Sequence, residues 1–524
     1  MAIIDPLTYN IVNGQAVDAT PVMADLNQIV SNVNANAVAS TTLAASGGAG
    51  LVGYSQGASG SVLRTLEAKA QESVSVLDFG ADPTGVADST AAIQAAIDSL
   101  GTAGGIITFP QHGTFQIASN LTITQNNIVL DVGYAVLNLN DATGTKDHIT
   151  LGNGTTQVQN CYVIGGIYTR TQAATSGAVV NFNYAAICGL ISNFYIYGAS
   201  KIYNGVKISQ GTEIKVLDGH IQGTVSDGVY AIGTSTSLTI DITVDRTRID
   251  SVGGNGVNFA DYVQGVYVRS NVIYACGLAG VTFSGGTAGA SQQYSFMVQN
   301  NDIDSCTSNG VFAQNCSKLK ITGNWISAGS GNQTNIQIGA GMSAVLVEGN
   351  DLYSASTTND SVDVQTTGEG ISILGNYIGG GRYGINAAAS ANIDVKNNTI
   401  AYCAQWGLYL ANNPASAHVI GNTFIGNTSG AITGSASTGV CYIANNPGYN
   451  PVGTAYGGVW GASPWTYTAG SSPETIYLMG GTVTNVQVNG VTVTNQTNSS
   501  FYLAPQQSAV ITYTSAGTLS KSVH

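Results

Sequence analysis

A short motif built on asparagine recurs through the middle of the chain. Its copies end on an apolar residue and follow one another at intervals of 22 to 30 residues. They read VRSNVI (268–273), VQNNDI (298–303), ITGNWI (321–326), LVEGNDL (346–352), ILGNYI (373–378), VKNNTI (395–400) and VIGNTF (419–424). The repeats also carry a second short apolar segment, such as GVFAQ (310–314) or SVDVQ (361–365). This period, with short strands and no helical pattern, predicts an all-β fold, a parallel β-helix whose coils stack about 4.8 Å apart.

Residues at equal positions of such repeats form columns along the stack. The asparagine column is Asn271, Asn301, Asn324, Asn350, Asn376, Asn398 and Asn422. Asparagine tolerates the left-handed backbone of a tight turn, and stacked amides can hydrogen-bond from coil to coil. We therefore interpret this column as structural. Cys276 and Cys306 occupy equal positions of adjacent coils. A disulfide between them is geometrically conceivable, but we predict buried thiols.

Composition excludes several classes of partner. Only 8% of the residues are charged and 44% are hydrophobic, which suits uncharged β surfaces and not a disordered chain. A net charge of −13 argues against nucleic acid, and the lack of a long apolar run argues against membrane insertion. The first basic residue is Arg64, so we expect no secretory signal. The seven cysteines are an odd number and contain no Cys-x-x-Cys, which argues against a disulfide framework or zinc site and fits synthesis in a reducing cytoplasm. We expect no metal and no organic cofactor.

Shifts in composition divide the chain into four parts. Residues 1–40 form a short helical segment, in which Thr20-Pro21 predicts a helix start and Leu26, Ile29, Val30 and Val33 a narrow apolar face that we expect to pack on another chain. Residues 41–72 read as a linker, and residues 73–455 as the β-helix with a capping helix at about 89–100. Asp78, Asp82 and Asp88 near its start are expected to serve turns and caps. Residues 456–524 read as a small β-domain with a hairpin turn at Asn489-Gly490.

The ends of the chain resemble a known family. VLDFGADPTGVADSTAAIQAAIDS followed by GGIITFP resembles the leading segment of the pectate-lyase-like superfamily, in particular the tailspikes and polysaccharide depolymerases of tailed bacteriophages. NGQAVDATPVMADLNQIVSNVNANA is similar to the virion-joining segment of phage tail proteins, and GYNPVG with SPWTYTAGSSPETIYLMGGTVTNVQVNGVTV to their C-terminal module. The resemblance implies a right-handed parallel β-helix in a homotrimer, joined through its N-terminus to phage baseplate or tail proteins. It also implies a virion location and a bacterial surface polysaccharide as partner.

Carboxylates are the candidate catalytic groups. Nucleophile motifs are not evident and the five histidines are scattered, whereas a pair of acids suits glycoside hydrolysis. Only 28 acids occur in 524 residues. One coil nevertheless holds Glu348, Asp351, Asp360, Asp363 and Glu369.

Two faces of the coils compete for the site. Strand alternation points the residue after each asparagine outward, which gives a column of Asp302, Trp325, Asp351 and Tyr377 and, two residues on, one of Tyr274, Asp304 and Tyr353. Asp302 and Asp351 would lie two coils, roughly 9.6 Å, apart, at the long end of the range for inverting glycosidases. Trp325 between them could stack on a sugar ring. The second face carries Asp363, with Asp360 at the start of its strand.

Alternatives stay open at this point. Outward aspartates can serve only to keep the surface soluble, and Trp325 could pack on a partner chain. The basic residues Lys201, Lys207, Lys215, Arg246, Arg248 and Arg269 could contact acidic sugars or pair with Asp241, Asp245 and Asp250. Our hypothesis is a tailspike that cleaves a capsule or lipopolysaccharide by hydrolysis. The alternatives are a polysaccharide lyase acting by β-elimination and a non-enzymatic receptor-binding fibre.

Overall fold

The computed structural model separates the chain into two compact units, residues 1–74 and 75–524. Within these units it describes residues 19–36, 40–155, 157–184, 186–286, 293–328, 333–388, 392–410, 416–434, 440–449, 454–470 and 472–523. Within these ranges, no helix is long and apolar enough to cross a membrane.

The first unit is mainly helical. It contains α1 (Ala19–Asn36), α2 (Ser40–Leu43), α3 (Leu66–Ala70) and the antiparallel pair β1 (Gly53–Tyr54) and β2 (Arg64–Thr65). Thr20 lies inside α1 and does not cap it, because the helix begins at Ala19; proline is tolerated throughout a first helical turn, which needs no N–H from it. The side chains of Leu26, Val30 and Val33 are 48%, 56% and 43% exposed, so the described residues leave this apolar face largely uncovered.

The second unit begins with turns and the helix α4 (Thr90–Ser99). Asp78 and Ser75 form a capping box around η2 (Val76–Phe79), and Asp88 accepts hydrogen bonds from the backbone N–H groups of Thr90 and Ala118. The carboxylate of Asp82 accepts three backbone N–H groups, and these bonds, led by that of Ala87, lower its pKa to about 2. The turn-and-cap interpretation of these aspartates is confirmed.

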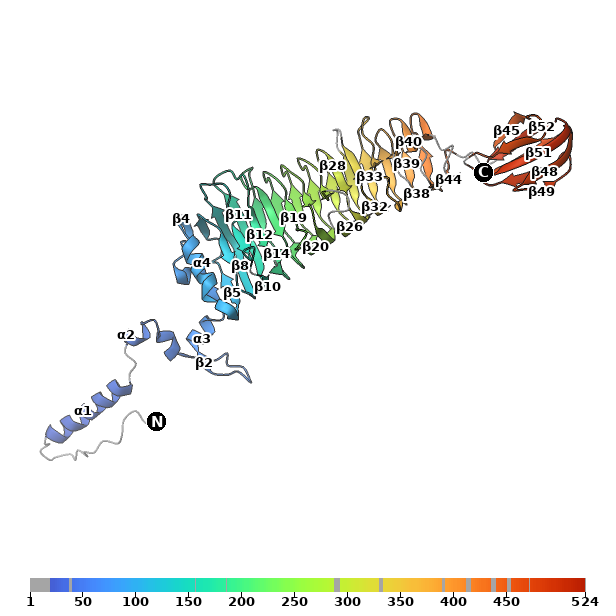
Figure 1. Ribbon diagram of the computed structural model, residues 1–524. Helices are drawn as coiled ribbons and strands as arrows, with labels where there is room; N and C mark the ends of the chain where they lie inside the picture. Colours follow the sequence, from blue (N-terminus) through green and yellow to red (C-terminus); the bar gives the residue numbers. More distant parts are fainter. Residues whose placement is uncertain are drawn as a thin grey trace. The chain divides into compact units, whose positions relative to one another are not determined.

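Parallel strands then wind into stacked coils with three sheets (Figure 1). Sheet I holds β14 (Leu190–Ser192), β17 (Lys215–Leu217), β20 (Thr239–Asp245), β23 (Val263–Arg269), β26 (Tyr294–Gln299), β29 (Ser317–Thr322), β32 (Ser343–Glu348), β35 (Ile371–Leu374), β38 (Asn392–Lys396), β41 (Ser416–Ile420) and β44 (Val440–Ala444). Sheet II holds β15 (Tyr195–Tyr197), β18 (His220–Gln222), β21 (Arg248–Asp250), β24 (Val272–Tyr274), β27 (Asp302–Asp304), β30 (Trp325–Ala328), β33 (Asp351–Ser354), β36 (Tyr377–Gly380), β39 (Thr399–Ala401) and β42 (Thr423–Ile425).

Sheet III has thirteen parallel strands and closes the coil. It holds β7 (Leu121–Ile123), β9 (Ile149–Leu151), β12 (Ala178–Asn183), β16 (Asn204–Ser209), β19 (Val229–Ile232), β22 (Val257–Phe259), β25 (Val281–Ser284), β28 (Asn309–Gln314), β31 (Thr334–Ile338), β34 (Val362–Val364), β37 (Ile385–Asn386), β40 (Trp406–Leu410) and β43 (Gly430–Gly434). Before these regular coils, β3 (Val74–Ser75), β4 (Thr84–Asp88), β5 (Gly105–Thr108) and β6 (Thr114–Ile117) lead into β8 (Ile128–Leu139) and β11 (Tyr162–Arg170), which run through sheets I and II without a break.

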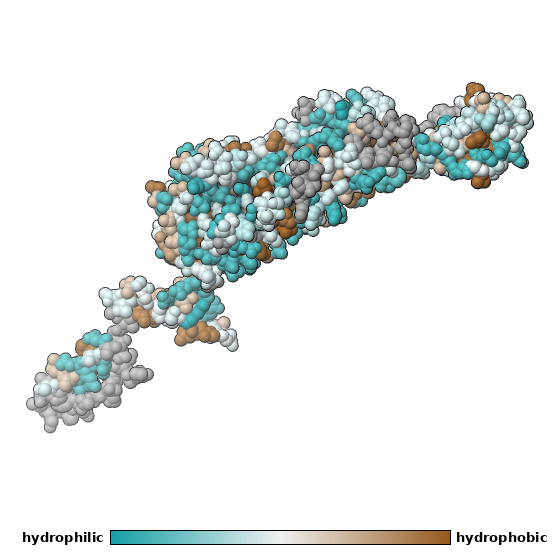
Figure 2. Space-filling view, viewed as in Figure 1, coloured by the Kyte–Doolittle hydropathy of each residue, from teal (hydrophilic) through white to brown (hydrophobic). Residues whose placement is uncertain are grey.

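Columns of aliphatic side chains fill the interior. In sheet II, Ile273, Ile303, Ile326 and Leu352 stack coil on coil and are fully buried. The outward face in view mixes hydrophilic and neutral residues, with scattered strongly hydrophobic ones (Figure 2). All seven cysteines are free, and Cys276 and Cys306 are buried thiols as predicted.

The corner between sheets I and II is held by the asparagine ladder. The side-chain nitrogen of Asn350 donates to the side-chain oxygen of Asn376 and to the carbonyl of Ile321, both at 2.9 Å. Its own oxygen accepts the backbone N–H and the side-chain amide of Asn324, again at 2.9 Å. The same pattern connects the other predicted members and extends to Asn446.

The left-handed backbone of this corner lies one residue before the ladder. The residue that precedes each ladder asparagine has a φ between 53° and 71°. These residues are Ser270, Asn300, Gly323, Gly349, Gly375, Asn397, Gly421 and Asn445. Tolerance of that conformation is therefore not the reason for the ladder asparagines, and this part of our interpretation was wrong. Their role is hydrogen bonding, because a buried amide supplies two donors and an acceptor at a point where the backbone groups of three coils meet.

The C-terminal residues form two antiparallel sheets around one apolar cluster that includes Trp460, Ile476, Val486 and Ile511. One sheet has the order β45 (Thr454–Val459), β52 (Thr518–Val523), β47 (Glu474–Met479), β50 (Ser500–Leu503), and the other β46 (Trp465–Thr468), β51 (Ser508–Ser515), β48 (Thr482–Val488), β49 (Val491–Thr494). Asn489 and Gly490 have φ of 52° and 77° between β48 and β49, which confirms the predicted hairpin.

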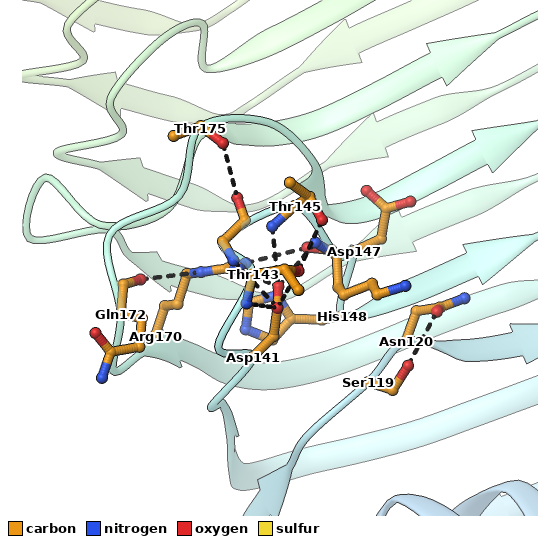
Figure 3. Close-up of polar contacts among 12 residues, drawn as sticks. Ser119, Asn120, Asp141, Thr143, Thr145, Asp147, His148, Arg170, Gln172 and Thr175 are labelled. Atoms are coloured by element: carbon orange, nitrogen blue, oxygen red, sulfur yellow. Dashed lines mark hydrogen bonds and ion pairs between the residues drawn. The ribbon is translucent and has the colours of Figure 1, made fainter.

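A buried ion pair stabilises a loop at the start of the coils (Figure 3). The guanidinium of Arg170 donates to the carboxylate of Asp141, and both side chains are only 2% exposed. Asp141 also accepts the backbone N–H groups of Thr143, Thr145 and Lys146. The neighbouring His148 is fully buried, with its Nε2 2.8 Å from the carbonyl oxygen of Thr169.

We predict that Asn350→Ala lowers the free energy of unfolding by about 2 to 4 kcal/mol, because it leaves buried donors of Asn324 and an acceptor of Asn376 without partners. Guanidinium unfolding followed by circular dichroism measures this. Thr399→Ala, on the outward face of β39, is the control and should change stability by less than about 0.5 kcal/mol. Equal stabilities of the two variants would contradict a structural role of the ladder.

We also predict that the protein loses stability as the pH falls from about 6.5 to about 4. Burial lowers the pKa of His148 from 6.5 to about 4, so over this interval the unfolded chain binds a proton that the folded chain does not. The loss from this residue approaches about 3 kcal/mol. Melting temperatures of wild type and His148→Gln across this interval test it: the variant should show the smaller acid-induced drop, and identical drops would disprove the assignment.

Candidate functional site

Sheet II presents two outward columns, which we call the sheet II stripe. Cross-strand pairing aligns Val272, Asp302, Trp325, Asp351 and Tyr377 in one column and Tyr274, Asp304, Ser327 and Tyr353 in the other. The structure thus has the register that the strand alternation predicts. The side chains of Tyr274, Trp325, Tyr353 and Tyr377 are 41 to 54% exposed, so aromatic surface alternates with carboxylates along several coils.

Asp302 and Asp304 lie on one strand, β27, and point to the same face. Two residues along a strand separate them by roughly 7 Å. Burial raises the pKa of Asp302 above its ordinary value, the nearby charge of Asp304 raises it further, and Arg248 opposes the shift. Asp304 accepts a hydrogen bond from the Ser305 hydroxyl at 3.0 Å. Two carboxyl groups are therefore held side by side, and burial together with the neighbouring charge raises the pKa of one of them, Asp302.

Trp325 lies one coil further on, next to Asp302, and the exposed Asp351 follows Trp325. Beyond them, Tyr353, Tyr377 and Tyr402 line a hollow of about 450 Å³, together with residues that include Gly379 and Gly380. Tyr402 was missed at the level of sequence. The sequence offered no signal for it, because strand alternation from the buried Ile400 would turn Tyr402 inward, whereas its left-handed φ of 57° leaves it 67% exposed.

Asp363 and Asp360 lie on the other face, at sheet III. Asp363 is in the column of Gln337 and Asn386, as predicted. Its oxygens accept hydrogen bonds from Gln365 at 2.6 Å and from Asn386 at 3.2 Å. Burial raises its pKa, and the charge of Asp360 adds to this against the opposing effects of Gln365 and Arg382. A hollow of about 330 Å³ adjoins it.

Asp360 is committed to an ion pair. Both of its oxygens accept hydrogen bonds from Arg382, at 2.8 and 2.7 Å, and they also bind Asn386 and the backbone N–H of Tyr383. The Asp360 side chain is 4% exposed. A buried carboxylate with these partners is a structural anchor, since proton transfer would break the pair. We therefore no longer regard Asp360 as a catalytic candidate.

The structure brings seven of the predicted residues together on sheet II: Asp302, Asp304, Asp351, Trp325, Tyr274, Tyr353 and Tyr377. It separates the remaining four from that stripe. Asp360 and Asp363 are at sheet III, Glu348 ends β32 of sheet I, and Glu369 lies in the bend before β35. The cluster of five acids in one coil is thus spread around its circumference.

Three of the basic residues that we considered for acidic sugars are engaged in ion pairs. Arg246 binds Asp218 and Asp245, Arg269 binds Asp245, and Arg248 binds Asp250. This confirms the pairing alternative for these arginines, although Asp218 and not Asp241 is the additional partner. In the described part of the chain no three His, Cys, Asp or Glu side chains gather as metal ligands would.

Comparisons with known proteins concern mainly the coils. Two overlapping stretches, residues 204–378 and 290–447, match the family model described as right handed beta helix region. No curated protein matches the sequence.

Solved structures with the same fold include the tailspike protein of Escherichia coli bacteriophage HK620 in complex with pentasaccharide, at 15% identity and a TM-score of 0.57 over 92% of this chain and 99% of that one. The Dettilon tailspike protein is similar at 15% identity and a TM-score of 0.52, over 88% and 95%. The A-module of a mannuronan C-5 epimerase from Azotobacter vinelandii is similar at 16% identity and a TM-score of 0.53, over 72% and 100%. The chain is thus a right-handed parallel β-helix protein, with the fold that phage tailspikes and this epimerase share.

Proposed function

We propose that this protein is a bacteriophage tailspike that binds a bacterial surface polysaccharide, capsule or lipopolysaccharide, and cleaves it by glycoside hydrolysis on sheet II. The observation that carries the proposal is the pair Asp302 and Asp304, in which burial and the neighbouring charge raise the pKa of Asp302, within a row of exposed aromatic rings. The HK620 tailspike in complex with a pentasaccharide supports the substrate class.

Asp302 is the general acid. A carboxyl group with a raised pKa keeps its proton closer to neutral pH and can deliver it to the departing glycosidic oxygen. Asp304, two residues along the same strand, is the base that activates a water molecule on the opposite side of the sugar. A separation of roughly 7 Å leaves room for that water and predicts inversion at the anomeric carbon. Asp351, two coils from Asp302, is the second possible base, at the long end of the same range.

The aromatic residues of the stripe position the polysaccharide. Sugar rings have apolar faces, and an exposed indole or phenol ring covers such a face while its polar edge remains hydrated. Trp325 stands directly beside Asp302 in the neighbouring coil, and Tyr274 beside Asp304. A sugar stacked on either ring would place its glycosidic oxygen near the acid pair.

The same proposal gives roles to the whole protein in the virion and to its N-terminal helix. The protein would act in the virion as a homotrimer after synthesis in the host cytoplasm. The exposed apolar face of α1, with Leu26, Val30 and Val33, would join phage baseplate or tail proteins. An exposed apolar helix face of this kind is buried when a partner helix or groove covers it.

We predict that Asp302→Asn and Asp304→Asn each lower kcat by about 100- to 10,000-fold, the usual contribution of a positioned acid or base. Asp363→Asn makes the same chemical change on sheet III and should stay within about threefold of wild type. The kcat of each variant is measured from the release of reducing ends from a panel of purified capsular polysaccharides and O-chains. Mass analysis identifies the products.

The outcomes separate the competing functions. Loss of activity in Asp363→Asn, with full activity in the two sheet II variants, would move the site to sheet III. Products with the ultraviolet absorbance of an unsaturated sugar would establish β-elimination in place of hydrolysis. A wild-type protein that binds cells and releases no oligosaccharide would be a receptor-binding fibre.

The pH profile gives an independent prediction. Because Asp302 must be protonated, kcat/KM should fall as the pH rises through its raised pKa, which lies above the ordinary aspartate value of about 3.9. Arg248 holds that pKa down, so Arg248→Gln should move the alkaline limb of the profile to higher pH. Lys320→Gln, on the outward side of sheet I, is the matched loss of one positive charge and should leave the limb in place. A limb that Arg248→Gln does not move would remove Asp302 from the acid role.

A further inference from the structure

The first coils lack the asparagine ladder. Strand register places Gly166, Phe194, Gly219 and Thr247 at the corner position that asparagine fills from residue 271 onward. The strands β8 and β11 pass this corner without a break, and their pairing shifts register on both sides of Gly165. A Cβ on Gly165 would lie 2.4 Å from the carbonyl oxygen of Gly133, so only glycine permits this close approach.

A hollow of about 640 Å³ results at this corner, larger than those beside Tyr377 and Asp363. We call it the N-terminal pocket. Its lining includes the aromatic rings of Tyr134 and Tyr195, the polar side chains of Asn193, Asp218 and His220, and several glycines. The register shift turns Tyr134 outward, where 69% of it is exposed, and its ring lies nearly parallel to that of His112 with the centroids 6.1 Å apart.

Contacts with neighbouring side chains hold Tyr195 and His220, which form another wall of the pocket, in place. The Tyr195 ring lies 4.9 Å from that of His220, and its hydroxyl donates to Gln222 at 2.9 Å. The Nε2 atom of His220 lies 2.9 Å from Asp250, whose same oxygen binds Arg248. Walls fixed in this way lose little conformational freedom when a ligand enters.

We propose that the N-terminal pocket is a non-catalytic subsite for a sugar unit of the polysaccharide that sheet II cleaves, an inference that rests on the function proposed above. Its aromatic walls suit the apolar faces of a pyranose, and Asn193, Asp218 and His220 supply a rim for its hydroxyl groups. Its acids are not free for acid–base work, because Asp218 is bound to Arg246 and the neighbouring Asp250 to His220 and Arg248.

Register connects this pocket to the acid pair. His220, Arg248, Val272 and Asp302 are successive members of one outward column. Three coil steps separate His220 from Asp302, roughly 14 Å at the β spacing. A polysaccharide that lies along sheet II therefore reaches both places, and the subsite anchors the chain several sugars from the bond that is cleaved.

The test uses the full-length chain carrying Asp302→Asn and Asp304→Asn, so that the polysaccharide stays intact. Its affinity is measured by calorimetry for those members of a panel of purified capsular polysaccharides and O-chains that the wild type binds. Adding Tyr134→Ala should weaken binding about 5- to 10-fold, as expected for one lost aromatic contact, and His220→Ala should weaken it similarly. Tyr267→Ala, an exposed tyrosine of sheet I, is the matched control and should leave the affinity unchanged.

In the active protein, Tyr134→Ala should raise KM for long chains and leave kcat within twofold. Unchanged affinity in both pocket variants, with folding verified by melting temperature, would overturn the subsite and leave the catalytic proposal standing. A change of oligomeric state in light scattering, without a change in affinity, would overturn it in favour of a partner chain as occupant. Failure of the wild type to bind any polysaccharide of the panel would overturn both proposals.

Discussion

The hydrogen bonds that join Asn271 to Asn446 through successive coils determine how the coils that carry the candidate site are arranged. A parallel coil must turn sharply between sheets I and II, and this turn would leave buried backbone groups without partners. A left-handed residue makes the turn, and the following asparagine satisfies the backbone of the coils on both sides. Because the corner is the same in each coil, the strand after it starts in the same register, and its outward residues fall into straight columns.

These columns assemble a site from residues that are far apart in the sequence. Asp302, Trp325 and Asp351 become neighbours only because three corners are superimposed. The surroundings of each aspartate on the coils then give the same kind of side chain different roles. Burial and Asp304 raise the pKa of Asp302 against the opposing charge of Arg248, whereas Asp360 is buried in a direct ion pair with Arg382 and anchors the corner of its coil. The same carboxyl group is thus a catalytic candidate on one sheet and part of the framework on another.

The hollow at the first coils shows what happens where the ladder is absent. Without an asparagine at the corner, β8 and β11 approach through glycines and shift their register, which turns Tyr134 outward and leaves space beneath it. In the later coils the asparagine side chains fill the corner, whereas the first coils, with glycine at two of their four corner positions, leave a recess there. The coils therefore combine a regular surface, suited to a polymer lying along it, with a recess suited to holding one unit of that polymer.

The sequence alone determined the coils, the strand alternation, the ladder and the outward columns of sheet II, because these follow from local period and register that repeat over 22 to 30 residues. It did not determine which residue of each corner is left-handed, since the ladder asparagine and the glycine or asparagine that precedes it in most copies all tolerate that backbone. Nor did it show that Arg382 engages Asp360, that Glu348 and Asp351 lie on different sheets, or that Asp302 is the acid with the raised pKa. Only the tertiary structure decided these points, because ion pairing, burial and the pocket under Tyr134 depend on contacts between coils, which local sequence patterns do not contain.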